Sequence, residues 1–206
     1  MSAERNWAGN ITYSAQRVHR PQSTAEIADI VRGAKKLRAV GSRHSFNTIA
    51  DSVRTWQVSQ APAGHWGEYT SPGIYAPGQL YKTITTDEEG RQAIEFKDKE
   101  GKLVLKKLQL AALPDSGMGC SHEGWICTYY MYDGLNDLRC VVQPEGVKWL
   151  RLHGWSFSAP GATTILEEQC FRYEYDGRGR LVMKKIPGAD VAYLVYDARN
   201  RLVMTQ

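Results

Sequence analysis

The chain has 206 residues and a formal net charge of +4, and its 42% apolar and 23% charged residues are ordinary for a soluble globular protein of one or two domains. No apolar run approaches the roughly 20 residues of a membrane span. The first residues lack the apolar core of a signal peptide, so a cytoplasmic location is the default expectation. The positive charge is local, because residues 1–54 carry a balance of +5 and residues 55–206 one of −1. We therefore expect no membrane span and no nucleic-acid partner.

Signals for a helix come first along the chain. Ser23 can cap a helix, and Glu26, three residues later, can complete a capping box. The apolar residues from Ile27 onward recur at helical spacing. The sequence predicts a helix of about three turns, interrupted by Gly33 and closed by a basic last turn, and then a buried strand over residues 37–40.

A glycine turn with the sequence Gly41-Ser42-Arg43-His44-Ser45-Phe46 follows this strand. A helix, a strand and a glycine turn in this order can present backbone amides to a phosphate or a ring. Together with Asn6 to Asn10 and His19 to Pro21, the segment resembles the N-terminus of the FAD-linked alditol and sugar-lactone oxidases, which carry the PCMH-type FAD domain of the vanillyl-alcohol-oxidase superfamily. The resemblance implies that FAD is attached covalently to His44. It also implies flavin contacts from Gly41, Ser42, Arg43 and Ser45.

The oxidase resemblance covers residues 1–54 and stops there. The second half of the flavin subdomain and the separate substrate domain of that family have no counterpart in the remaining sequence. A flavin held by one helix and one turn would leave most of its surface in water, whereas ligand binding requires burial in a formed pocket. We therefore predict a partial FAD-binding subdomain without catalytic residues of its own. The alternative is an FAD-dependent oxidoreductase that oxidises an alcohol through flavin on His44.

The middle of the chain changes from linker-like to β-rich sequence. Residues 55–74 are rich in proline and glycine and predict a linker. Residues 91–110 alternate as two strands joined at 98–101, and the second of these is apolar on both faces, so it is either buried on both sides or liable to slip its register. One more strand is predicted at Thr128–Tyr132. Short helices at Pro144–Leu152 and Thr163–Gln169 would cover the sheet.

The last 36 residues contain a repeat. The segment Tyr175 to Met183 (YDGRGRLVM) returns 21 residues later as Tyr196 to Met204 (YDARNRLVM). Alternating apolar residues lead into a tight turn in both copies, so each copy predicts a β-hairpin. The aspartate can bind backbone amides two residues on, and Gly179 or Asn200 can adopt the left-handed conformation. Weaker copies occur at Tyr132–Leu138, Asp87–Gly90 and Asp98–Gly101.

The phrase Tyr-Asp-x-x-Gly/Asn-Arg-Leu, with the text Gly78 to Thr83, resembles the tyrosine-aspartate (YD) repeat of the rearrangement-hotspot (Rhs) proteins. These large bacterial proteins, often exported or on the cell surface, wind such repeats into a β shell around a toxic or adhesive cargo. The resemblance implies a mixed fold, with a short α/β fragment followed over residues 75–206 by a mainly β, antiparallel hairpin-repeat sheet with one or two short helices.

The two resemblances together predict a non-catalytic fragment of an Rhs-type scaffold fused to a truncated flavin-oxidase start. So few repeats cannot close a shell, and the sheet would keep open edges, which predicts self-association. The cargo is unknown. The join is either a genuine fusion or an artefact of sequence assembly.

Other catalytic and metal-binding patterns are weak. The four cysteines, Cys120, Cys127, Cys140 and Cys170, include no Cys-x-x-Cys, so we expect free, mostly buried thiols. Cys120, His122 and Cys127 could supply zinc ligands, but their spacing fits none of the usual sites, and no metal is expected. Ser121-His122-Glu123 are neighbours in sequence, which does not place them as a triad in space. The acidic runs read as solvated surface.

Overall fold

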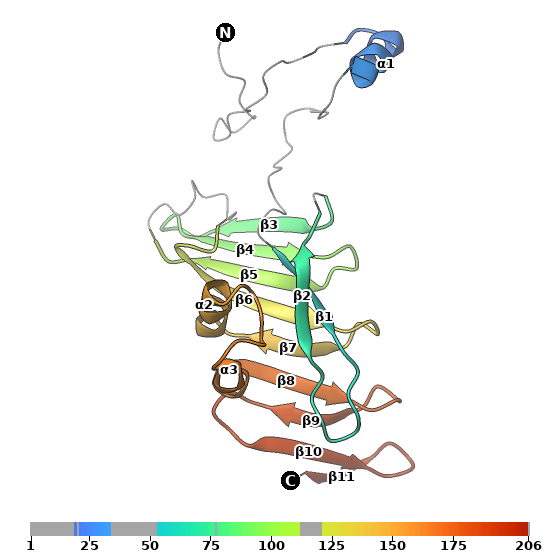
Figure 1. The fold of residues 1–206 in the computed structure, drawn as a ribbon, viewed down its shortest axis with the longest axis vertical. Helices are drawn as coiled ribbons and strands as arrows, with labels where there is room; N and C mark the ends of the chain where they lie inside the picture. Colours follow the sequence, from blue (N-terminus) through green and yellow to red (C-terminus); the bar gives the residue numbers. More distant parts are fainter. Residues whose placement is uncertain (1–18, 20, 34–52, 77, 112–120, 206) are drawn as a thin grey trace. The chain divides into compact units, whose positions relative to one another are not determined.

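The computed structural model describes residues 19, 21–33, 53–76, 78–111 and 121–205 (Figure 1). The chain divides into two units, Met1–Asn47 and Thr48–Gln206. In the described part of the first unit, helix α1 spans Thr24–Gly33 and buries none of its residues. Ser23 Oγ accepts the Glu26 N–H at 3.3 Å, which confirms the predicted cap. The strand predicted at 37–40 and the basic turn before it lie outside the described residues.

The second unit is built on a nine-stranded antiparallel sheet in which neighbours in sequence are neighbours in space (Figure 1). This meander confirms the mainly β, antiparallel class. Its order leaves β3 and β11 as the two edge strands. The strands are β3 (Tyr81–Thr86), β4 (Gln92–Lys97), β5 (Leu103–Gln109), β6 (Trp125–Tyr132), β7 (Leu138–Val142), β8 (Cys170–Tyr175), β9 (Leu181–Lys185), β10 (Val191–Tyr196) and β11 (Leu202–Thr205).

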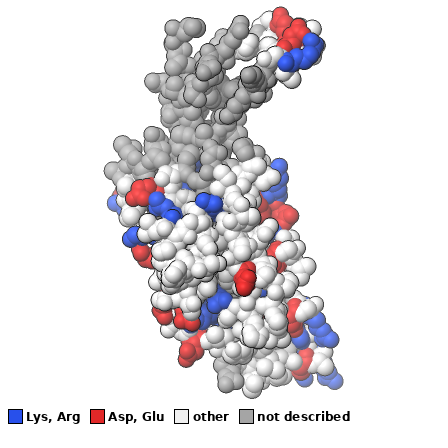
Figure 2. Space-filling view, in the orientation of Figure 1, with Lys and Arg blue, Asp and Glu red and all other residues white. Residues whose placement is uncertain are grey.

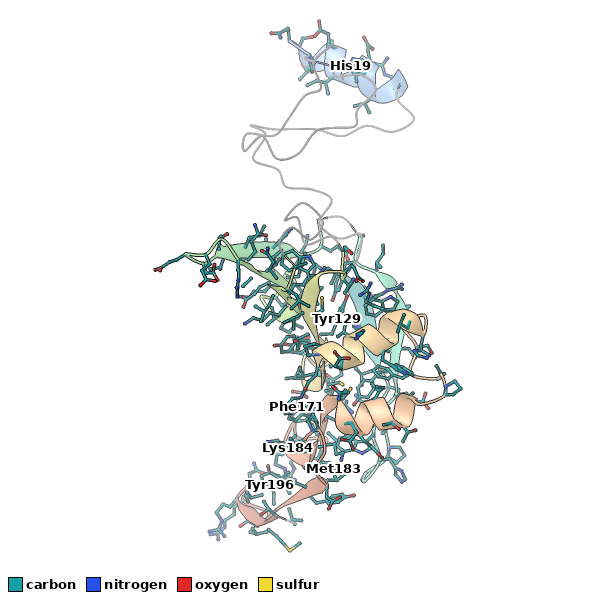
Figure 3. The ribbon with its side chains drawn as sticks, turned by 90° about the vertical axis from the view of Figure 1, so that its left-hand side faces the viewer. His19, Tyr129, Phe171, Met183, Lys184 and Tyr196 are labelled. Atoms are coloured by element: carbon teal, nitrogen blue, oxygen red, sulfur yellow. The ribbon has the colours of Figure 1, made fainter. Side chains whose placement is uncertain are left out.

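Alternation along the strands separates the two faces of the sheet. In β6 every second residue is buried, among them Tyr129 and Met131, because successive side chains point to opposite faces. Figure 3 shows Tyr129 and Met183 on the side of the helices, and Phe171 and Lys184 on the other side. The hydrophobic core therefore lies between one face of the sheet and the elements that cover it.

Two helices and a hairpin cover that face (Figures 1 and 3). Helix α2 (Pro144–Leu152) begins at a proline, which suits the first turn of a helix, and α3 spans Ala162–Glu168. Both helices were predicted, and their bounds agree within a residue. A Cβ at Gly146 would lie 2.8 Å from Val142 Cγ1, so glycine lets α2 approach the sheet closely.

The structure differs from the linker expected at residues 55–74. This stretch forms a two-stranded hairpin of β1 (Arg54–Val58) and β2 (Tyr69–Ile74). Pro72 is accommodated within β2 because the pairing with β1 shifts its register between Thr55 and Gln57, which leaves the proline without a register partner. The prolines and glycines of this stretch therefore belong to a folded hairpin, where they lie in its loop and in β2.

Candidate functional site

The residues predicted to hold flavin, Gly41, Ser42, Arg43, His44 and Ser45, lie outside the described residues. Their role therefore stays a prediction. The interactions described below belong to the unit Thr48–Gln206.

The same hairpin turn occurs five times among the described residues of the sheet. In each turn an aspartate Oδ1 accepts the backbone N–H groups of the residues two and four positions later, at 2.7 to 3.0 Å. The role predicted for the aspartate is confirmed, and it extends to the degenerate copies. The five aspartates are Asp87, Asp98, Asp133, Asp176 and Asp197.

The fourth residue of every such turn has a left-handed backbone, with φ between 62° and 84°. Only glycine enters this region without steric cost, and asparagine tolerates it better than most residues. The roles predicted for Gly179 and Asn200 are confirmed. The five residues are Gly90, Gly101, Asn136, Gly179 and Asn200.

Four of these turns lie at one end of the sheet. Since strand direction alternates, the turns that follow β4, β6, β8 and β10 share an end, opposite to the turn at Asp87 (Figure 1). We call the turns that begin at Asp98, Asp133, Asp176 and Asp197 the turn row. Each of its members is separated from the next by the width of two strands, roughly 10 Å.

Neighbouring members of the turn row contact one another through a basic residue. Lys102, the last residue of the first turn, donates to Asn136 Oδ1 in the second turn. The Lys102 ammonium also lies 5.4 Å from the ring centre of Tyr132, within range of a cation–π interaction. One lysine thus holds both the aromatic residue and the asparagine of the following turn.

The same contact recurs between the third and fourth turns. Arg180 Nη1 donates to Asn200 Oδ1 at 3.0 Å, and the guanidinium lies 5.0 Å from the ring centre of Tyr196. Its Nε also donates to Asp176 Oδ2 at 2.7 Å. The sequence analysis did not predict this contact. Its signal in the sequence is a basic residue at the end of one turn, Arg180, and an asparagine four residues after the tyrosine of the next copy, Asn200.

A buried ion cluster connects the second and third turns. Arg139 Nη1 donates to Asp133 Oδ2 at 2.9 Å, and Arg139 Nη2 donates to Glu174 Oε2. All three side chains are at most 7% exposed. Burial alone would lower the pKa of Arg139, but its hydrogen bonds to the two carboxylates raise that pKa, so the guanidinium stays charged.

The β1–β2 hairpin binds to this cluster. The Gly67 N–H donates to Glu174 Oε1 at 2.8 Å, and the Arg172 guanidinium lies 4.3 Å from the ring centre of Trp66. A Cβ at Gly67 would lie 2.3 Å from the carbonyl oxygen of Ser59, so only glycine fits the hairpin at this point.

A second buried polar group lies beneath α2. The Tyr129 hydroxyl accepts the Arg54 N–H at 3.1 Å and lies 3.0 Å from His122 Nε2. Burial, and then the charges of Lys107, Arg151 and Arg54, lower the pKa of His122 to about 3. A histidine with so low a pKa is uncharged at neutral pH and is a poor general base there.

Trp155 packs against this histidine–tyrosine pair and has an uncommon backbone conformation. Its φ is 64°, a conformation that is costly for a bulky side chain. The ring lies 4.9 Å from that of His122 and 5.5 Å from that of Tyr129, centre to centre. Aromatic packing around the buried hydroxyl holds the residue in place.

One cavity of about 140 Å³ lies where β1 meets the turn row. Ligand pockets usually enclose about 300 to 1,000 Å³, so a flavin does not fit here. The lining includes Arg54, Tyr75, Asp98, Lys102 and Tyr132.

Within the described ranges no group of three or more His, Cys, Asp or Glu side chains is arranged to hold a metal ion. Cys120 lies outside these ranges, and the Cys127 thiol donates to the Trp125 carbonyl at 3.7 Å. The helices of the described residues are too short or too polar to cross a membrane.

The comparison with known proteins found a match to part of the chain. A 51-residue segment is 55% identical to an alditol oxidase of Streptomyces sp., and it covers 24% of this chain and 12% of that oxidase. This similarity supports a relationship of the segment to flavin oxidases. No family model matches the chain, so the Rhs resemblance stays a prediction.

Proposed function

We propose that residues 48–206 act as a non-catalytic hairpin-repeat scaffold of the Rhs type, joined to a partial flavin-oxidase subdomain. The observation that carries this proposal is the turn row, in which one turn geometry recurs and one inter-turn contact, that of Lys102 and of Arg180, occurs twice. Contacts that link each unit to its neighbour are typical of repeat arrays, whose stability is a sum of units and interfaces.

The ionisable groups of the scaffold support the non-catalytic part of the proposal. Hydrogen bonds from Arg180 lower the pKa of Asp176 to about 2, and the His122 pKa is about 3. Catalytic acids and bases work best with a pKa near the operating pH. Both groups are instead committed to one protonation state that stabilises the fold.

The edge strands support a role in association. β11 exposes Leu202, Val203 and Met204, and β3 exposes Tyr81 and Ile84. An unpaired edge offers a row of backbone donors and acceptors to another strand. Self-association through such edges is part of the proposed function.

A flavin-dependent oxidase is the second candidate, because the 55% identity to an alditol oxidase is high for a segment of 51 residues. We assign this segment to the region of Gly41 to Ser45, with His44 as the attachment site for FAD. Bound flavin would accept a hydride from an alcohol. The cavity of about 140 Å³ does not fit FAD, and this candidate places the flavin on residues 1–54, where the predicted attachment site lies.

One experiment separates the two candidates. The purified full chain is precipitated with acid after incubation with FAD, and flavin absorbance from about 350 to 500 nm is measured in the pellet, where covalently attached cofactor would remain. The scaffold proposal expects a colourless pellet. A yellow pellet for the unmodified chain and for His65→Ala, but not for His44→Ala, would establish flavin on His44 and overturn it.

A further inference from the structure

The cavity of about 140 Å³ lies in the unit Thr48–Gln206, beside the turn row. Its lining comes from β1, β5 and β6, from the first two turns of the turn row, and from Tyr75, which follows β2. A cavity of this size holds several water molecules but not a drug-sized ligand. An occupant of the cavity is therefore a small molecule or ion.

The two carboxylates that line the cavity already have cationic partners. Asp133 Oδ2 accepts a hydrogen bond from Arg139 Nη1 at 2.9 Å, and Asp98 Oδ2 lies 3.5 Å from Lys102 Nζ. In both aspartates Oδ1 accepts two backbone N–H groups. The cavity therefore offers no unpaired carboxylate to a cation, and Lys102, which also lines it, is paired as well.

Three other lining residues carry hydrogen-bond donors that none of the described residues accepts. The Arg54 guanidinium lies 5.1 Å from the ring centre of Trp155 and forms no ion pair or hydrogen bond with a described residue, and neither does the Tyr75 hydroxyl. Trp56 Nε1 is buried and also has no partner among them. Burial, and then the charge of Asp98, raises the pKa of Tyr75, so its hydroxyl keeps the proton. Unpaired donors in a cavity are costly, and an acceptor ligand would satisfy them.

We propose that this cavity binds a small organic monocarboxylate. One or both carboxylate oxygens would accept hydrogen bonds from the Arg54 guanidinium, whose planar fork matches a carboxylate. The Tyr75 hydroxyl and the Trp56 indole N–H would supply further donors. Val104 and Met131 also line the cavity and offer apolar contact to a short hydrocarbon chain. The proposal goes beyond the scaffold function and uses no flavin.

The charge balance of the lining selects a singly charged ligand. The charges of Asp98, Asp133 and Lys102 are paired, which leaves that of Arg54 for the ligand. A monocarboxylate would neutralise it, whereas phosphate, with more than one negative charge at neutral pH, would add excess charge beside the two aspartates. On the face of this unit that Figure 2 shows, acidic and basic side chains are interspersed, so no broad basic field favours a multiply charged anion.

The test titrates the purified full chain with sodium butyrate and follows the ligand by saturation-transfer-difference NMR. We expect saturable binding with a Kd of about 0.1 to 1 mM, because so small a ligand gains limited free energy. Butyramide, a neutral analogue of the same shape, should bind at least about 10-fold more weakly, because it forms no charge-assisted hydrogen bond. Inorganic phosphate should also bind at least about 10-fold more weakly than butyrate.

Three variants assign the binding to this cavity. Arg54→Gln should weaken butyrate binding about 10-fold or more, through the loss of a charge-assisted contact, and Tyr75→Phe about 2- to 10-fold, through the loss of one hydrogen bond. The matched control is Arg151→Gln, which removes an arginine that pairs with the exposed Glu123 outside the lining, and its affinity should stay within about twofold. Near-ultraviolet circular dichroism checks the fold of each variant. Should Arg54→Gln fail to fold, Tyr75→Phe and butyramide decide the outcome.

Several results would overturn the proposal. They are the absence of saturable butyrate binding, binding of butyramide or phosphate as tight as that of butyrate, and unchanged butyrate affinity in a folded Arg54→Gln or in Tyr75→Phe. Equal weakening in Arg151→Gln would overturn it too, because binding would then depend on general positive charge. The titration needs no flavin, so its outcome is independent of the colour of the acid pellet.

Discussion

Arg139 Nη1 donates a 2.9 Å hydrogen bond to Asp133 Oδ2, and through this contact the second turn of the turn row is tied to the interior of the protein. In the third turn the corresponding oxygen of Asp176 binds Arg180, four residues later in the same turn. Asp137 occupies that position in the second turn. The arginine is instead supplied by β7, where the pairing with β6 shifts its register after Met131.

Replacing Arg139 should test how far the fold depends on this cluster. Arg139→Met would leave the buried carboxylates of Asp133 and Glu174 without their cation, and we expect the free energy of unfolding to fall by about 3 to 5 kcal/mol. Urea unfolding measures the change. The matched variant Arg180→Met breaks a partly exposed ion pair and should cost about 1 kcal/mol or less. Equal losses in the two variants would contradict the role of burial.

Local features of the fold were predictable from the sequence, whereas long-range ones were not. The turns at Asp176 and Asp197 and the helix that begins at Pro144 follow from neighbouring residues, whose chemistry acts over a few positions. The hydrogen bond from the Gly67 N–H to Glu174 joins residues 107 positions apart, and no local sequence pattern predicts it. Because this bond could not be predicted, residues 55–74 were expected to form a linker, whereas they form the β1–β2 hairpin.

The candidate site likewise contains local features that the sequence predicts and long-range contacts that it does not. The role of the turn aspartate and the left-handed conformation of Gly179 and Asn200 were predicted, but the inter-turn contacts of Lys102 and Arg180 depend on which strands are adjacent in the sheet. Periodicity gives strands and turns, and it leaves open which side chains meet across them. The predicted flavin residues depend on resemblance alone, because they lie outside the described residues.

The buried His122 should make stability depend on pH below neutrality. Its folded pKa of about 3 lies below its ordinary value of 6.5, so the unfolded chain takes up this proton first as the pH falls. The free energy of unfolding should fall from its full value above pH 6.5 by about 1.5 to 2 kcal/mol between pH 7 and pH 5. Urea unfolding at several pH values measures this slope.

Two substitutions make the pH experiment specific. His122→Gln should remove the fall between pH 7 and pH 5, whereas His65→Gln, in the exposed loop of the β1–β2 hairpin, should keep it. A slope that persists in His122→Gln would assign the effect to other groups.

Two glycines of one turn provide a test of backbone strain. Gly179 has φ of 71°, whereas Gly177 lies outside the left-handed region, and a Cβ at either position meets no heavy atom within 4 Å. Gly179→Ala should cost about 1 to 2 kcal/mol, because alanine is disfavoured at positive φ. Gly177→Ala should be neutral or stabilising by a few tenths of a kcal/mol, through the unfolded state. Thermal unfolding of both variants gives the comparison, and the same melting temperature for both would rule out strain as the reason for glycine at 179.

Gly67 tests whether the β1–β2 hairpin is an integral part of the fold. A Cβ here would lie 2.3 Å from the Ser59 carbonyl oxygen, so Gly67→Ala must spread the hairpin and lengthen the bond to Glu174. We expect a loss of about 1 to 3 kcal/mol, the usual cost of overpacking. The near-ultraviolet circular dichroism should also weaken, because Trp66 leaves the Arg172 guanidinium. Gly134→Ala, in the open second turn, is the control and should change neither quantity. An unaltered spectrum for Gly67→Ala would mean that the hairpin lies on the sheet without depending on this contact.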